Sequence, residues 1–254
     1  MIRLGLCTDI ANILEAEAVG FDYVEGKLNG IAELGEPEFA DALARVRSSA
    51  INVERCCLLL PKSMSVIGAV YDERELVAYL HGAFMRMREL GSDLVVFGSG
   101  KSRFIPAGMR WQEAFLQLVE VTRTIGLVAK EYGIRIAIEP LNRAETNLIN
   151  SLAEGAALQA EVGMENVGLL ADAFHMRKEG EPIERIGLVA PLMHAHIAMK
   201  DGRAYPVLLD EEVVEFFSAL KASGYDGTVS IEGKSDDWLR DSVKAIAVMR
   251  PLCQ

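Results

Sequence analysis

The strongest constraint on the fold is a recurring pattern in which an amphipathic helix ends near a glycine and a short apolar strand follows. A glycine just past a helix end can take the left-handed conformation that closes the last turn without a Cβ clash. Each such glycine therefore marks a junction from helix to strand. The clearest junctions lie at Gly20, Gly91, Gly133, Gly163 and Gly224.

Filling the gaps between these junctions predicts eight strands and eight helices. The expected strands cover residues 2–7, 23–25, 52–58, 94–97, 135–139, 167–171, 193–198 and 228–232. The expected helices cover residues 12–19, 37–47, 75–90, 111–132, 151–162, 181–189, 211–222 and 238–249. The strands run apolar rather than strictly alternating, which is typical of parallel strands covered by helices.

Eight βα units in 254 residues predict an α/β fold, the (β/α)8 TIM barrel. An open, doubly wound sheet is the alternative, because periodicity does not show whether a sheet closes. No linker or low-complexity segment divides the chain, so we expect a single domain over residues 1–254.

Composition narrows the range of partners. The chain has 26 basic and 37 acidic side chains, a formal net charge of −11, which disfavours binding to nucleic acid or to an anionic membrane surface. No apolar run is long enough to span a membrane, and the segment MIRLGLCTDI lacks the features of a secretory signal. The four cysteines match neither a disulfide framework nor a paired zinc site. We expect a cytoplasmic protein with a small-molecule partner, and a homo-oligomer is left open.

Polar side chains stand at the ends of four consecutive expected strands, where a barrel places its functional groups. These are Glu139, Asp172, His196 and Glu232. Glutamates that follow apolar runs such as IAI and VSI would be buried charges, which are costly unless something compensates them. Three carboxylates with one imidazole suit a divalent cation such as Mn²⁺, Mg²⁺ or Co²⁺ with room for further oxygen ligands.

Two points about this cluster stay open at the level of sequence. Glu139 and Glu232 could instead form ion pairs with basic residues at the rim, namely Arg135, Arg143 or Lys234. His194 lies two residues before His196, so both side chains point to the same face of the strand. Because one histidine already completes four ligands, we expect His194 to position its neighbours or to pack.

The glycine-rich segment FGSGKSRFIP follows the fourth expected strand. It is not a Walker phosphate loop, which would need a glycine where the chain has Val95. Its backbone amides, beside Lys101 and Arg103, are expected to receive a phosphate or carboxylate of the substrate. A solvated loop whose basic side chains face water is the alternative.

One segment resembles a known family. Residues 138–151, IEPLNRAETNLINS, are similar to the hallmark of the ketose 3-epimerases, typified by D-tagatose and D-psicose 3-epimerases, within the xylose isomerase-like TIM barrel superfamily. The Asp172-x-x-His175 motif, His196 followed by Arg203, and the strand-terminal Glu232 come in the order of that family.

The resemblance implies one divalent metal ion bound by Glu139, Asp172, His196 and Glu232, with Mn²⁺ expected and Mg²⁺, Co²⁺ or Zn²⁺ as alternatives. It also implies that Glu139 and Glu232 serve as the acid/base pair. The residues that would contact the sugar are Glu145, His175 and Arg203.

The expected activity is metal-dependent epimerisation of a ketose or ketose phosphate at C3. One glutamate would remove a proton, the metal would stabilise the enediolate, and the other glutamate would return a proton from the opposite face. Related barrel enzymes with the same ligands are the alternatives: a hydroxypyruvate isomerase, a keto-inositol dehydratase or a sugar-phosphate epimerase. A non-catalytic sugar-binding protein is less favoured, because a binder needs no two-sided proton relay.

Overall fold

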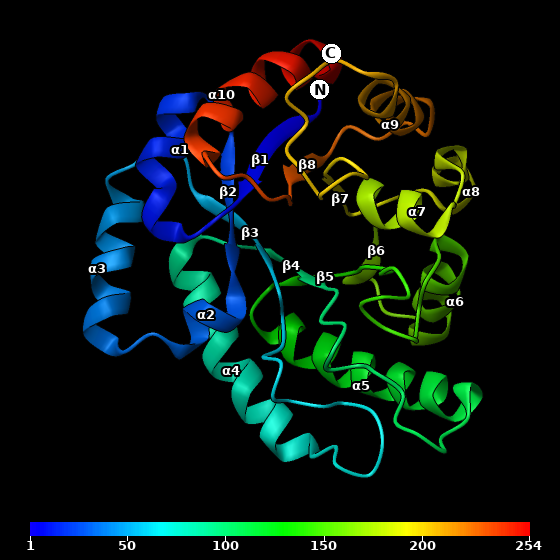
Figure 1. Ribbon diagram of the computed structural model, residues 1–254. Coiled ribbons are helices and arrows are strands. Elements are labelled where there is room, and N and C mark those ends of the chain that lie inside the picture. The colour runs from blue at the N-terminus through cyan, green and yellow to red at the C-terminus, as the bar shows by residue number, and fades with distance from the viewer.

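The computed structural model describes residues Met1 to Gln254 and forms a closed barrel of eight parallel strands with helices around it (Figure 1). The strands are β1 (Arg3–Cys7), β2 (Tyr23–Lys27), β3 (Val53–Cys57), β4 (Leu94–Phe97), β5 (Arg135–Ile138), β6 (Val167–Asp172), β7 (His194–Ile197) and β8 (Thr228–Ile231). They follow one another around the barrel in chain order, and β1 pairs with β8 to close it. The expected barrel is therefore confirmed and the open sheet is excluded.

The helices also lie close to the expected positions. They are α1 (Ile13–Val19), α2 (Leu28–Glu33), α3 (Glu36–Arg47), α4 (Glu73–Leu90), α5 (Trp111–Glu131), α6 (Leu152–Val162), α7 (Ala173–Glu179), α8 (Ile186–Val189), α9 (Glu211–Ala222) and α10 (Trp238–Met249), with short 3-10 helices η1 (Ile10–Asn12), η2 (Ile183–Arg185) and η3 (Arg250–Cys253). None of them is both long and apolar enough to cross a membrane. The two ends of the chain meet, since the Ile2 amide donates to the Cys253 carbonyl at 3.1 Å.

The junction glycines take the expected left-handed conformation, but the helices differ from the prediction in three details. All five have positive φ, between 64° at Gly133 and 102° at Gly20. The helix expected at residues 181–189 is split into η2 and α8, with Pro182 at the start of η2. The short helices α2 and α7 are not predicted from the sequence, because one or two turns give too little periodicity to recognise.

Strand geometry explains both the apolar runs and the polar ends. Along β4, Leu94 and Val96 point into the barrel and pack in its interior cluster, whereas Val95 and Phe97 belong to the core between sheet and helices. Side chains two positions apart on a strand share a face. Ala137 and Leu170 also belong to the interior cluster, so Glu139 and Asp172, two residues further along, are directed into the mouth of the barrel.

The amino-terminal end of the barrel is filled. Asp93 pairs with Arg55 and, at 3.0 Å, with Arg135. Above them the fully buried Tyr23 hydroxyl shares a hydrogen bond of 2.8 Å with Ser230 Oγ. The polar side chains that remain inside the barrel therefore gather at its carboxyl end.

Candidate metal centre

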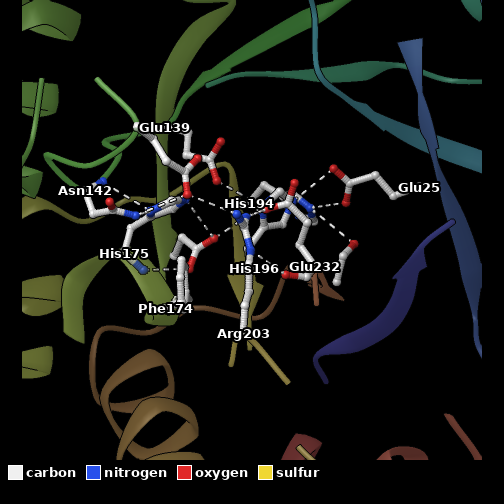
Figure 2. Close-up of polar contacts among 12 residues, drawn as sticks. Glu25, Glu139, Asn142, Phe174, His175, His194, His196, Arg203 and Glu232 are labelled. Carbon is white, nitrogen blue, oxygen red and sulfur yellow. Dashed lines mark hydrogen bonds and ion pairs between the residues drawn. The ribbon is translucent and has the colours of Figure 1, made fainter. Parts of the chain in front are cut away.

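The four expected ligands come together at the carboxyl end of the barrel. Figure 2 labels three of them, Glu139, His196 and Glu232. Their ligand atoms all lie within 4.8 Å of one another. His196 is central: its Nδ1 atom lies 3.2 Å from Glu139 Oε1, 3.8 Å from Asp172 Oδ2 and 3.5 Å from Glu232 Oε2. One imidazole nitrogen thus faces three carboxylates.

The negative charge of this cluster sets its protonation. Burial lowers the pKa of His196, but the charge of Glu25 and hydrogen bonds to Glu139, Glu232 and Glu25 outweigh it, so the pKa lies well above the ordinary value. Burial and the charge of Glu232 raise the pKa of Glu139. Burial also acts to raise the pKa of Glu232, but His196 and Arg203 outweigh it and bring the pKa to about 2.

The donor set fits a divalent cation. Asp172 Oδ1 accepts hydrogen bonds from the amides of Phe174 at 2.6 Å and His175 at 3.1 Å, whereas its Oδ2 is buried with no hydrogen-bond partner. A buried carboxylate oxygen without a partner is costly unless a cation compensates it. Three carboxylates and one imidazole are ligands that Mn²⁺, Mg²⁺ and Zn²⁺ accept, and their protons leave when the metal binds.

Glu25, in the middle of β2, belongs to this cluster and was not identified by the sequence analysis. It is fully buried, and its two oxygens lie 2.9 Å from His194 Nε2 and 3.0 Å from His196 Nε2. A carboxylate that accepts the Nε2 proton of His196 leaves Nδ1 free to bind a metal, the usual carboxylate–histidine–metal arrangement. The signal was available, because Glu25 is the last residue of the expected strand 23–25.

His175 lies in α7 rather than in the expected loop, and it is buried. Its Nδ1 atom accepts hydrogen bonds from the Asn142 amide at 3.1 Å and the Asn142 side chain at 2.8 Å. Two donors at Nδ1 place the ring proton on Nε2, which is buried without a partner and 3.9 Å from Asp172 Oδ2. The imidazole therefore presents an unused N–H donor beside the cluster.

Arg203 and Glu145 lie at the other side of the cluster. The Arg203 guanidinium donates to a Glu232 carboxylate oxygen, and its Nη1 lies 3.3 Å from Glu145 Oε1. Its carbon Cζ lies 4.8 Å from the centre of the Phe174 ring, a cation–π contact. Arg203 thus holds Glu232 in place, and the structure brings both expected sugar contacts to the site.

The rim ion pairs considered as an alternative do not form. Arg135 pairs with Asp93 at the opposite end of the barrel, and Arg143 pairs with Glu179. Lys234 has no ion pair.

The two basic residues of the glycine-rich segment lie in different environments. Lys101 is exposed, but Arg103 is fully buried, and its guanidinium donates to the carbonyls of Phe97 and Glu139. This placement corrects the expectation that Arg103 faces a substrate anion: it joins the ends of β4 and β5 instead. Gly98 between them has no room for a side chain, since a Cβ would lie 2.1 Å from Glu139 Oε2.

We predict that Asp172→Asn weakens metal binding without unfolding the protein. The asparagine oxygen can still accept the two α7 amides, whereas the amide nitrogen cannot replace the charged Oδ2 ligand. Changing a residue that only hydrogen-bonds to a metal ligand typically lowers metal affinity about 10- to 100-fold. Because Asp172 is itself a proposed ligand, we expect a larger loss. Titration calorimetry with Mn²⁺ measures it. Asp210→Asn is the matched control, because Asp210 caps α9 outside the site. Equal metal affinity of Asp172→Asn and wild type would contradict the assignment.

A second prediction concerns Glu25→Gln. Glutamine offers one oxygen and one amide group to two histidines that both need an acceptor, so the His196 tautomer is no longer fixed. We expect a roughly 10- to 100-fold loss of metal affinity. Thr228→Val is the control, because Thr228 Oγ1 bonds His194, at 2.8 Å from its Nδ1, and accepts from Arg55 at 3.4 Å, but does not bond His196. If both variants bind metal equally well, Glu25 does not position His196.

Comparison with known proteins agrees with this geometry. A family model described as xylose isomerase-like TIM barrel matches residues 13–252. A probable ketose 3-epimerase of Synechocystis sp. is 31% identical over 189 residues, 69% of this chain and 62% of that protein. An L-ribulose 3-epimerase of Mesorhizobium japonicum is 29% identical over 180 residues, 65% of this chain and 56% of that protein. The matches thus span about three-fifths of the length of these relatives.

The fold is shared with solved structures over the whole chain. A crystal structure of D-psicose 3-epimerase in the presence of D-fructose superposes with a TM-score of 0.88 at 20% identity, covering 99% of both chains. A 3-keto-D-glucoside 4-epimerase from E. coli superposes with a TM-score of 0.81 at 20% identity, covering 99% of this chain and 100% of the other. Because the family model matches nearly the full sequence, the chain belongs to the xylose isomerase-like TIM barrel family.

Proposed function

We propose that the protein is a divalent-metal-dependent epimerase that inverts a ketose at C3. The observation that supports this most directly is the placement of Glu139 and Glu232, which follow β5 and β8 and reach the same imidazole nitrogen, at 3.2 and 3.5 Å. Inversion at carbon needs one acid/base group on each side of the reacting atom. A substrate seated over this cluster has one glutamate from each strand beside it.

The two glutamates have different protonation tendencies, which suits a proton relay. The pKa of Glu232 is about 2, so this carboxylate is ionised and can accept the C3 proton. In the metal-free site, burial and the charge of Glu232 raise the pKa of Glu139, so of the two carboxyls it holds a proton more readily until a cation binds. Environments that push the pKa values of two carboxyls apart are typical of acid/base pairs. For the opposite epimer the roles reverse.

The remaining residues orient the sugar. The unpartnered Nε2–H of His175 is available to a substrate oxygen, and Arg203 and Glu145 offer a donor and an acceptor on the other side of the cluster. Arg203 also keeps Glu232 ionised and fixes its carboxylate. A divalent cation bound by Glu139, Asp172, His196 and Glu232 would supply positive charge that stabilises the negative charge developing on the substrate oxygens.

We predict that Glu139→Gln and Glu232→Gln each lower turnover by about 10²- to 10⁴-fold, the usual contribution of a positioned acid/base group. Each variant is assayed with saturating Mn²⁺ and its metal content is measured, because both residues are also proposed ligands. With one base missing, the substrate proton should still exchange with solvent from the remaining face, while the epimer no longer forms.

Glu54→Gln is the control for this pair, since Glu54 is a barrel glutamate at the opposite end, bound to Arg3. It should leave turnover unchanged. Wild-type turnover in both metal-loaded site variants would show that Glu139 and Glu232 are structural.

The reaction itself is tested by incubating the metal-loaded protein with free and phosphorylated ketoses in deuterated water. Deuterium at C3 of the product supports the proposal. Deuterium at C1 or C2 indicates aldose–ketose isomerisation instead, and loss of water indicates a dehydratase. Either of these outcomes would replace the proposed reaction while keeping the same metal centre.

A further inference from the structure

A cavity of about 260 Å³ lies beside the proposed metal centre, and apart from Glu145 its lining has no role in the reaction described above. Its polar side chains are those of Asn29, Lys62, Ser99, Lys101, Ser102 and Glu145, and Gly100 also lines it. These residues belong to the loops that follow β3, β4 and β5 and to the start of α2, so the cavity opens at the catalytic end of the barrel.

The cavity adjoins the site, although none of the four proposed metal ligands lines it. Glu145 lines it and also lies 3.3 Å from Arg203, which binds Glu232. On the other side Ser99 lines the cavity, and the preceding Gly98 packs directly against the Glu139 carboxylate. A substrate whose reacting carbons lie over the metal centre can therefore extend into the cavity.

Two exposed lysines line the cavity without a carboxylate partner. Neither Lys62 nor Lys101 forms an ion pair, although the chain has 37 acidic residues against 26 basic ones. Glu145 is the acidic residue of the lining, and its carboxylate is engaged by Arg203 and, at 3.2 Å, by the Asn142 side chain. The two exposed ammonium groups thus stand beside a cavity whose one carboxylate, that of Glu145, is bound by other side chains.

The backbone of the same turn adds unused donors. Ser99 has a φ of 40°, and its carbonyl accepts the amides of Ser102 at 2.9 Å and Arg103 at 3.3 Å. The amides of Gly100 and Lys101, between them, have no acceptor in the protein. Successive free amides in such a turn form an anion-binding concavity.

We propose that this cavity is a subsite for a phosphate group at the end of the substrate remote from the reacting carbons, so that the substrate is a ketose phosphate. The inference rests on the proposed function for the position of the reacting carbons. A phosphate monoester carries a charge of about −1.5 to −2 and three acceptor oxygens at neutral pH. Two exposed ammonium groups and two free amides match it, whereas a neutral hydroxymethyl end would use neither lysine. Lys62 therefore replaces Arg103 as the second basic residue, beside Lys101, that would bind the anionic group of the substrate.

The test uses an unreactive probe, so that binding is measured whether or not the protein epimerises any sugar. Arabinitol 5-phosphate has no carbonyl group and cannot be deprotonated beside one. Its dissociation constant is measured by calorimetry on the metal-loaded wild type and on Lys62→Ala, Lys101→Ala and Lys101→Arg. Lys130→Ala is the matched control, because Lys130 is an exposed lysine near the end of α5, outside the cavity.

Each alanine variant at the cavity should weaken binding of the probe by about tenfold, as expected for the loss of one charge-assisted contact, and Lys101→Arg should restore most of it. The affinity for Mn²⁺ should not change in any variant. The proposal is overturned if the wild type does not bind the probe, or if the lysine variants bind it as the wild type does, which would place the phosphate on the metal. Epimerisation of free ketoses together with that result would leave the proposed function intact and remove only the subsite.

Discussion

Three carboxylates share one buried imidazole nitrogen at the mouth of the barrel, and the surrounding polar structure depends on that concentration of negative charge. With a fourth carboxylate, Glu25, behind the ring, His196 holds a proton that burial alone would remove. Arg203 supplies a second positive charge on one side. Like charges in a desolvated site repel strongly, so the cluster favours any cation that reaches it. A divalent ion that displaces the proton of His196 is the compensation that this geometry suits best.

The barrel itself explains why this cluster could be predicted from sequence. In a closed parallel barrel every strand ends at the same rim, and each strand's inward face is known once one inward residue is known. Glu139, Asp172, His196 and Glu232 each stand at such an end, so four separate positions converge. Applied to the expected strand at residues 23–25, the same rule also selects Glu25. This residue was missed at the level of sequence because only the ends of the last four strands were considered.

Other features depend on contacts that no local pattern reveals. Arg103 stands in a glycine-rich segment that predicts an exposed basic loop, yet its side chain folds inward to two carbonyl groups that only the paired ends of β4 and β5 bring together. The helix α7 has seven residues and follows its strand without a break, so its sequence AFHMRKE gives no clear period. Its start is fixed by Asp172, whose capping role is visible only when the strand end is known.

Asp172 also shows how the fold connects the metal ligands to the substrate contacts. One carboxylate oxygen caps α7 and the other faces the cluster, so the ligand and the helix that bears Phe174 and His175 are positioned together. The proposed ligands stand on rigid strands or directly after them, whereas the proposed sugar contacts stand on a short helix and on loops. Loops tolerate change far better than barrel strands do. The proposed metal-dependent proton transfer would therefore depend on the barrel, and the proposed choice of sugar on the segments that surround its mouth.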